Sequence, residues 1–122
     1  MPITLNHTIV PSRDKESSAK FFAKIFGLRY DGPAGHFAQV HVNPDLSFDW
    51  DNRDTFEPHH YAFLVGDEEF DTAFARISGG GIQFFADPGC QQPGQIYRSH
   101  GRRGTYFRDP DGHLMEILTP AA

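Results

Sequence analysis

The sequence predicts an α+β fold made of two similar halves, each with one helix and several strands. Apolar residues recur at the helical spacing i, i+3, i+4, i+7 from Ala19, and again from Phe70, 51 positions later. A segment that alternates apolar and polar residues precedes each helical stripe. These two segments carry His7 and His60, which stand 53 positions apart. The similar offsets indicate an internal duplication of a βαβββ unit.

The first half begins with an alternating strand over 3–10, followed by a helix that Ser12 or Asp14 can cap. Gly27 follows the apolar stripe and is expected to end the helix. A Gly-Pro-Ala-Gly loop comes next. Two further strands are expected on either side of a tight Asn-Pro-Asp turn, over 36–42 and 46–50.

The second half repeats this plan, with Asp67 as the expected helix cap and three glycines, 79–81, after the helix. A stretch rich in Gly, Pro and Gln, 86–101, is expected to be a loop. The last two strands are expected to form a hairpin in which Gly112 takes a positive φ. The strands expected in this half are 59–65, 82–85, 103–108 and 113–119.

The chain is long enough for one domain, residues 1–122, made of half-modules 1–50 and 59–122. A polar segment, 51–58, joins the halves. Each half has too few elements to bury a core by itself. We therefore expect the halves to pack together or to pair with a second copy of the chain.

Composition limits the partners. The formal net charge is −5, which argues against nucleic acid or an anionic membrane as a partner. The first 20 residues contain no apolar signal segment, and no later stretch has the length of a membrane span. Cys90 is the single cysteine, so an internal disulfide is excluded, which suits a reducing compartment. A cytoplasmic location is expected.

The strongest candidates for chemistry are His7, His60 and Glu116, which each lie on an alternating, strand-like segment. A polar residue on an apolar strand face needs a partner, and a shared metal ion would supply one. Two imidazoles and one carboxylate form a facial ligand set that leaves positions open for water or substrate. This set suits Fe, Mn, Zn, Ni or Co, so the sequence predicts a divalent metal without naming it.

Four motifs carry a resemblance to a known superfamily: Leu5-Asn-His7, Phe26-Gly-Leu28, His60-Tyr-Ala-Phe63, and Phe107-Arg-Asp-Pro-Asp-Gly-His-Leu-Met-Glu116. Together with the duplicated βαβββ plan, they resemble the vicinal oxygen chelate superfamily. That group includes glyoxalase I, bleomycin-resistance proteins, fosfomycin-resistance enzymes and extradiol dioxygenases. The resemblance implies a curved, cup-like mixed sheet with helices outside. It also implies a small-molecule substrate that chelates the metal through neighbouring oxygens.

The function expected from this resemblance is that of a metal-dependent enzyme, with glyoxalase-like or dioxygenase-like chemistry. Lyase, isomerase, ring-cleaving and thiol-transferase reactions all fit the ligand set. The alternative is a binding protein of the bleomycin-resistance type, which sequesters a small molecule or antibiotic without metal chemistry. The three candidate ligands favour the enzyme. A homodimer is also expected, because relatives of this size commonly pair.

Two further residues have open roles. If the last hairpin is symmetric about Asp111, Tyr106 lies opposite Glu116, where its phenol could donate to substrate as a catalytic group. The alternative is an aromatic ring that only packs. Asp49 resembles a first-half counterpart of Glu116, which would make it a fourth ligand. A solvent-facing Asp49 beside Trp50 is favoured, because the two turns differ in length and a one-residue slip reverses the face.

Two other groups of polar residues have less specific signals. His113 belongs to the predicted hairpin turn, where a structural or solvent-facing role is expected. A basic cluster before the last hairpin could bind an anion, although a solvated loop is the favoured interpretation. The members of this cluster are Arg98, His100, Arg102 and Arg103.

Overall fold

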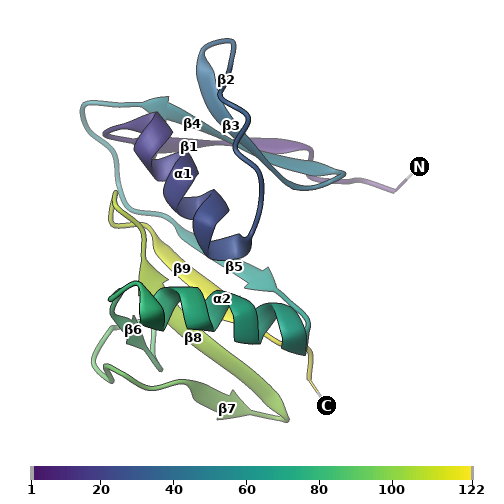
Figure 1. Ribbon diagram of the computed structural model, residues 1–122, viewed down its shortest axis with the longest axis vertical. Coiled ribbons are helices and arrows are strands. Elements are labelled where there is room, and N and C mark those ends of the chain that lie inside the picture. The colour runs from purple at the N-terminus through teal and green to yellow at the C-terminus, as the bar shows by residue number, and fades with distance from the viewer. Residues whose placement is uncertain (1, 122) are drawn as a thin grey trace. The chain divides into compact units, whose positions relative to one another are not determined.

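The computed structural model describes residues 2–121, so Met1 and Ala122, the outer ends of the predicted domain and its half-modules, lie outside it. The chain divides into two compact units between Glu57 and Pro58. Among the described residues there are two helices and two mixed β-sheets, one helix and one sheet in each unit (Figure 1). The predicted α+β class is confirmed. Neither helix is long and apolar enough to cross a membrane.

The first unit has a four-stranded sheet in the order β1-β4-β3-β2. Its elements are β1 (His7–Ser12), α1 (Lys15–Phe26), β2 (Pro33–Ala34), β3 (Phe37–Asn43) and β4 (Leu46–Asn52). The first and last strands, β1 and β4, run parallel, and all of β1 pairs with Ser47–Asn52 of β4. The short β2 falls within the stretch expected to be a Gly-Pro-Ala-Gly loop, and it pairs with β3.

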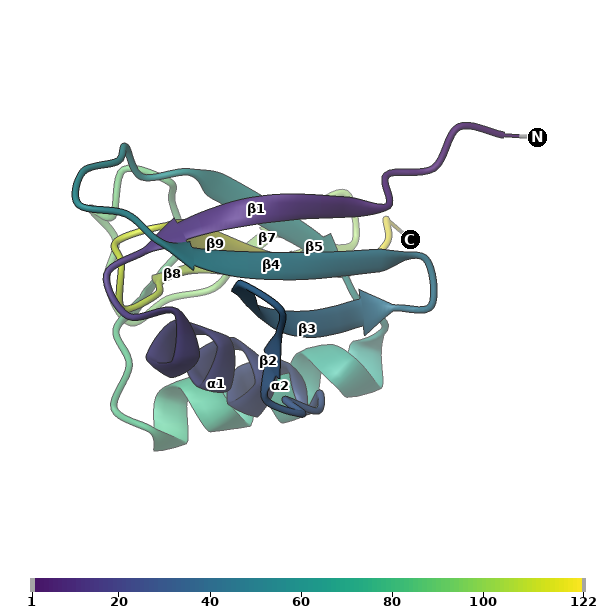
Figure 2. The ribbon, with the colours of Figure 1, turned by 90° about the horizontal axis from the view of Figure 1, so that it is seen from above.

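Helix α1 begins and ends as the sequence predicts. Asp14 caps it by accepting a hydrogen bond from the backbone N–H of Ser17 at 3.2 Å, and Gly27 follows it with a left-handed φ of 67°. The helix lies on one face of the sheet (Figure 2). Phe22 packs there against Trp50, with ring centroids 5.2 Å apart and both rings buried. The opposite face of the sheet is therefore left for polar side chains.

The second unit has a five-stranded sheet with the path β5-β9-β8-β6, to which β7 adds by pairing with β8. Its elements are β5 (His60–Leu64), α2 (Asp67–Gly79), β6 (Phe84–Phe85), β7 (Tyr97–Ser99), β8 (Arg102–Arg108) and β9 (Leu114–Leu118). Strands β5 and β9 pair in parallel, as β1 and β4 do in the first unit. The duplication read from the sequence is thus present in the strand pairing.

Two expectations for the second unit are wrong. Gly66, not Asp67, occupies the cap position of α2, and it offers no side-chain hydrogen bond; Asp67 is the first helical residue. Residues 86–101 are also not all loop, because Tyr97–Ser99 pairs with β8 as β7. A three-residue strand leaves no alternating pattern long enough to recognise in a sequence rich in Gly and Pro.

The turn between β8 and β9 fixes the register of the last hairpin. Asp109 accepts hydrogen bonds on one carboxylate oxygen from the backbone N–H groups of Asp111, at 2.9 Å, and His113, at 2.8 Å. Gly112 has a φ of 85°, as expected. The resulting register places Tyr106 opposite Glu116, which confirms the predicted pairing.

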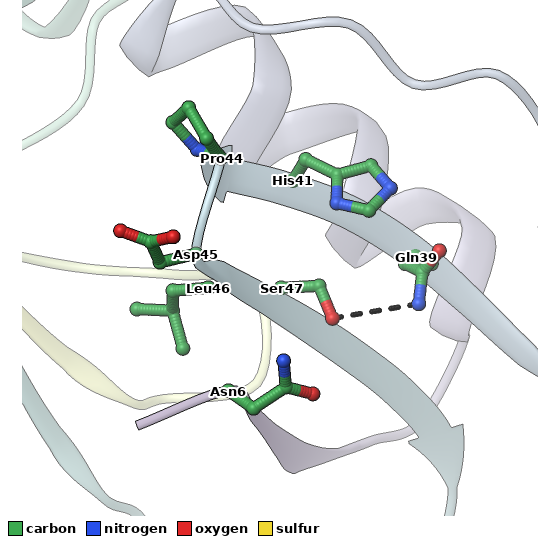
Figure 3. Close-up of a pocket in the computed structure, with 7 residues that line it drawn as sticks. All are labelled: Asn6, Gln39, His41, Pro44, Asp45, Leu46 and Ser47. Carbon is green, nitrogen blue, oxygen red and sulfur yellow. Dashed lines mark hydrogen bonds between the residues drawn. The ribbon is translucent and has the colours of Figure 1, made fainter. Parts of the chain in front are cut away.

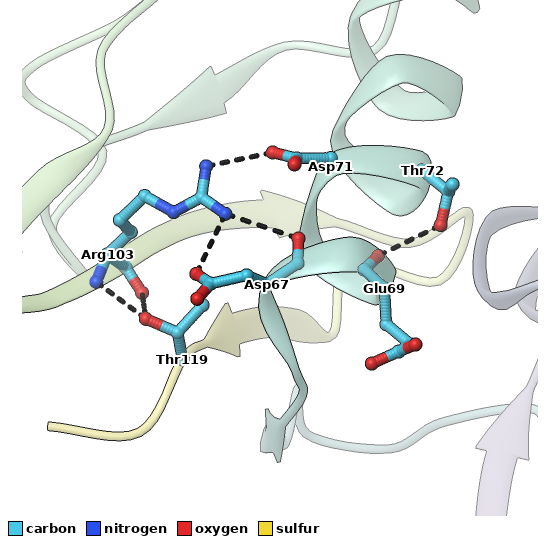
Figure 4. Close-up of polar contacts among 6 residues, drawn as sticks. All are labelled: Asp67, Glu69, Asp71, Thr72, Arg103 and Thr119. Carbon is cyan, nitrogen blue, oxygen red and sulfur yellow. Dashed lines mark hydrogen bonds and ion pairs between the residues drawn. The ribbon is translucent and has the colours of Figure 1, made fainter. Parts of the chain in front are cut away.

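Arg103 joins β8 to the start of α2 (Figure 4). Its guanidinium forms ion pairs with Asp71 at 2.9 Å and Asp67 at 3.1 Å, and its Cζ lies 4.4 Å from the ring centroid of Phe70. These contacts assign Arg103 a structural role. It is therefore not part of a solvated basic loop, unlike the exposed Arg98.

Replacing Arg103 with lysine should lower the free energy of unfolding by about 1 kcal/mol. The single ammonium group of lysine cannot pair with both Asp67 and Asp71 and also stack on the ring of Phe70, as the planar guanidinium does. Both carboxylates are largely exposed, so screening keeps the loss small. Urea denaturation measures the change, with Arg98→Lys as the control, because Arg98 is an exposed residue of strand β7. Equal stability of the two variants would contradict the structural role of Arg103.

Candidate metal centre

The parallel pairing of β5 with β9 brings His60 and Glu116 together. His60 lies opposite Leu114, and Glu116 lies opposite Ala62, two positions further along both strands. Residues two apart on a strand share a face of the sheet. The Nε2 atom of His60 and the Oε1 atom of Glu116 are 3.3 Å apart. Two of the three predicted ligands are therefore neighbours within one unit.

The hydrogen bond on the other ring nitrogen of His60 limits its tautomer. Nδ1 of His60 lies 2.9 Å from the backbone carbonyl oxygen of Leu114, and a carbonyl oxygen only accepts, so Nδ1 carries a hydrogen. In the neutral ring, Nε2 then carries no hydrogen, and its lone pair faces a carboxylate oxygen of Glu116. Such a pair needs a proton or a metal ion between its members. The donor set and its orientation fit a metal, since metal-binding histidines usually donate their other N–H to a carbonyl or carboxylate.

The second oxygen of Glu116 has a different partner, which the sequence did not reveal. The hydroxyl of Tyr97 donates a hydrogen bond to Oε2 of Glu116 at 2.6 Å. Burial, together with this bond, raises the pKa of Tyr97 above its ordinary value, so the phenol stays protonated as a donor. The Glu116 side chain is only 10% exposed, so this bond satisfies a carboxylate oxygen that has little access to water.

Tyr106 completes an aromatic row beside this pair. Its ring centroid lies 5.8 Å from that of Tyr97 and 6.0 Å from the imidazole of His60. Burial, followed by the negative charge of Glu116, raises the pKa of Tyr106. Tyr106 and Glu116 are thus neighbours, as predicted, and the phenol of Tyr106 stays protonated near neutral pH.

His7 occupies the equivalent place in the first unit. It begins β1 opposite Ser47 of β4, as His60 begins β5 opposite Leu114 of β9. Its Nδ1 lies 2.8 Å from the side-chain oxygen of Asn6, which leaves Nε2 as the nitrogen that can bind a metal. His7 belongs to a different unit from His60, so its convergence on the same ion stays a prediction.

Asp49 corresponds to Glu116 in the strand pairing. It lies opposite Ile9 of β1 and Gln39 of β3, as Glu116 lies opposite Ala62 of β5 and Tyr106 of β8. The favoured expectation, a solvent-facing Asp49, is wrong, since only 6% of the residue is exposed. The turn sequence of the first unit is one residue shorter than that of the second, and the strand register shifts between His41 and Asn43 to compensate for this difference. Asp49 therefore keeps the same strand position as Glu116.

The carboxylate of Asp49 already has two donors from its own sheet. It accepts hydrogen bonds on Oδ1 from Gln39, at 2.9 Å, and from Ser47, at 3.2 Å. Gln39 and Ser47 also line a pocket of about 190 Å³ at one end of this sheet (Figure 3). Its other lining residues are Asn6, His41, Pro44, Asp45 and Leu46. The pocket is thus a polar hollow close to the start of β1.

A second candidate cation cluster lies in the β8–β9 turn. The ligand atoms of Asp109, Asp111 and His113 all lie within 4.8 Å of one another, and all three residues are buried. Two of them already have partners: Asp109 accepts the backbone hydrogen bonds of the turn described above, and Nδ1 of His113 accepts one from the N–H of His59, just before β5, at 2.8 Å. These bonds account for the geometry of the turn, and they confirm a structural role for His113.

Residues 4–117 match the family model described as the glyoxalase, bleomycin resistance protein and dioxygenase superfamily. The match covers most of the 122 residues, and the chain belongs to this superfamily. The resemblance drawn from the four motifs is confirmed.

Two solved structures are similar to this chain over almost its full length. Oxidase ChaP-H2 is 45% identical with a TM-score of 0.94, covering 100% of this chain and 98% of its own. Oxidase ChaP-H1 is 48% identical with a TM-score of 0.93, covering 98% and 97%. Among curated proteins, the glutathione transferase FosA of Serratia marcescens is 27% identical, over 93% of this chain and 79% of its own length.

More distant structures share the fold. The fosfomycin resistance protein FosX of Mesorhizobium loti has a TM-score of 0.71 at 22% identity, covering 99% of this chain and 95% of its own. At that identity the likeness shows the fold alone.

Proposed function

We propose that this chain is a metal-dependent enzyme that oxidises a small organic substrate, with dioxygen as the oxidant, while the substrate is bound to the metal through two neighbouring oxygens. His7, His60 and Glu116 are the proposed ligands. The observation that carries the proposal is the contact of 3.3 Å between Nε2 of His60 and Oε1 of Glu116. The other ring nitrogen of His60, Nδ1, already donates to the carbonyl oxygen of Leu114. A divalent ion would replace the proton that this contact otherwise needs.

The residues around the pair have defined tasks. A bound divalent metal would supply Lewis acidity toward the oxygens of the substrate. The Leu114 carbonyl keeps the imidazole of His60 in one orientation. Tyr106, which lies opposite Glu116, offers a protonated phenol that can donate to a substrate oxygen as negative charge develops there.

Oxidation is favoured over the other reactions of the superfamily because two relatives at 45% and 48% identity are named oxidases. The thiol-transferase alternative is supported by curated relatives at 24% to 27% identity, named FosA and FosB. A purely sequestering protein is disfavoured, since it has no need for the paired His60 and Glu116.

Alanine at His7, His60 or Glu116 should each abolish stoichiometric binding of a divalent metal, because the ion loses one of three protein anchors. The measurement is elemental analysis after purification without chelators and dialysis against Fe²⁺, Mn²⁺ or Zn²⁺. His41→Ala is the matched control, because it removes an exposed imidazole from β3, a strand that carries none of the three proposed ligands. Full metal retention in all three variants would contradict the ligand assignment.

We also propose a homodimer. His7 and His60 lie on β1 and β5, each of which is the end strand of its sheet among the described residues. Apolar side chains on these strands are exposed: Ile9 is 42% and Leu64 is 65% accessible. Open strand edges and exposed apolar groups favour pairing with another chain.

If the site takes His7 from one subunit and His60 with Glu116 from the other, then mixed subunits of His7→Ala and Glu116→Ala should regain one intact metal site per dimer. Co-expression with two affinity tags and metal analysis of the doubly tagged dimer measures this. A His60→Ala and Glu116→Ala mixture is the control, because both losses fall in the same unit and restore no site. Absence of metal in both mixtures would show that the ligands come from one chain.

Tyr106→Phe should keep the metal and lower kcat by roughly 10²-fold, the usual cost of losing one donor to a developing oxyanion. The ring remains, so packing against His60 and Tyr97 is preserved. Dioxygen consumption with the metal-loaded protein and a panel of catechols, hydroquinones and α-hydroxyketones provides the assay. An unchanged kcat would show that Tyr106 only packs. Turnover that depends on a thiol and consumes no dioxygen would contradict the proposed oxidation and favour the thiol-transferase alternative.

A further inference from the structure

The side chain of Tyr97 passes over Gly104, and its hydroxyl bonds to Glu116. In the β7–β8 pair, Tyr97 is directly opposite Gly104. A β-carbon placed on Gly104 would overlap three atoms of the Tyr97 side chain, Cζ, Cε2 and the hydroxyl oxygen. The phenol ring therefore occupies the space beside Gly104 that the β-carbon of any other residue would fill.

Space, not backbone conformation, requires a glycine at this position. Gly104 lies inside β8 and lacks the positive φ of Gly112, so its backbone accepts other residues. Glycine in the middle of a strand weakens the strand and often marks the close approach of another group. Here that group is the ring of Tyr97.

The hydroxyl at the end of the ring reaches Glu116, the carboxylate proposed as a metal ligand. Gly104 lies opposite Leu118 of β9, and Glu116 is two residues earlier on the same face. The hydroxyl of Tyr97 meets Oε2 of Glu116 at 2.6 Å, and Oε1 of the same carboxylate faces His60 at 3.3 Å. One oxygen is thus retained by the phenol, and the other is presented toward the imidazole.

We propose that Tyr97 is a positioning residue that makes Glu116 a one-oxygen metal ligand, and that Gly104 provides the space this requires. The inference rests on the proposed function, because it names how one ligand of that site is oriented. Tyr97 does not contact the metal or the substrate in this arrangement. It prevents the carboxylate from rotating to offer both oxygens, which keeps one more coordination position open for the substrate.

Tyr97→Phe should weaken metal binding by about 10- to 100-fold, the usual effect of removing the group that orients a ligand. Competition of Zn²⁺ between the protein and a chromophoric chelator measures the affinity. The visible absorption of the Co²⁺ form reports a changed coordination number, which a purely structural loss would not alter. Tyr30→Phe is the matched control, because it removes a phenol that donates to another carboxylate, Glu16, at 3.2 Å.

Gly104→Ala should reproduce the effect of Tyr97→Phe while the tyrosine is still present, because the new methyl group displaces the ring. In a Tyr97→Ala background, Gly104→Ala should cost no further metal affinity, since no ring remains to be displaced. Circular dichroism identifies any variant that fails to fold. Independent losses that add in the double variant would overturn the role of Gly104.

A measurement without metal tests the positioning directly. A phenol held by a carboxylate at 2.6 Å should give a slowly exchanging, downfield hydroxyl proton in the metal-free protein. The signal should be present in the unmodified chain and in Tyr30→Phe, and lost in Tyr97→Phe and Gly104→Ala. Its persistence in Gly104→Ala would overturn the inference.

The two proposals fail in different ways. If the unmodified chain binds neither Zn²⁺ nor Co²⁺, then the proposed function is wrong, and the role of Tyr97 toward a metal is wrong with it. If the unmodified chain binds metal and Tyr97→Phe binds it with the same affinity and spectrum, only the positioning role is overturned.

Discussion

The site depends on one constraint, the parallel pairing of the first and last strands of each unit. In the second unit this pairing joins β5 to β9 and brings together residues 56 positions apart in the sequence, His60 and Glu116. Parallel neighbours cannot be linked by a short turn, so the helix and the intervening strands of the unit form the connection. The pair proposed to bind the metal therefore lies where the first and last strands of the unit meet.

A carboxylate placed at this position is costly unless its charge is compensated. The Glu116 side chain is 10% exposed, and its two oxygens face different partners, the hydroxyl of Tyr97 and the imidazole of His60. A neutral phenol donor offsets part of the desolvation without neutralising the charge. The remaining negative charge stays available on the side of His60, where the proposed metal would bind.

The sequence predicted those features of the site that follow from short-range rules. The Tyr106–Glu116 pair came from one tight turn, because a hairpin register is fixed by its turn. Tyr97 was missed because a 16-residue stretch rich in Gly, Pro and Gln, 86–101, hides a three-residue strand. Asp49 was placed on the wrong face because an irregularity between strands, which corrects the register, has no sequence signature of its own. The proposed convergence of His7 with the pair would depend on long-range packing, which periodicity does not specify.

The two units share a geometry but differ in what surrounds the equivalent carboxylate. Asp49 is one methylene shorter than Glu116, and Oδ1 of Asp49 accepts from both Gln39 and Ser47 within its own sheet. In the second unit, Tyr106 stands in the place of Gln39 and Leu114 in the place of Ser47. Leu114 cannot donate from its side chain, so Glu116 lacks a counterpart of the bond that Ser47 donates to Asp49, and its Oε1 lies 3.3 Å from Nε2 of His60. The duplicated fold supplies two similar positions for a carboxylate, and only in the second does a carboxylate oxygen lie against an imidazole among the contacts described above, which is the basis for proposing Glu116 as a metal ligand.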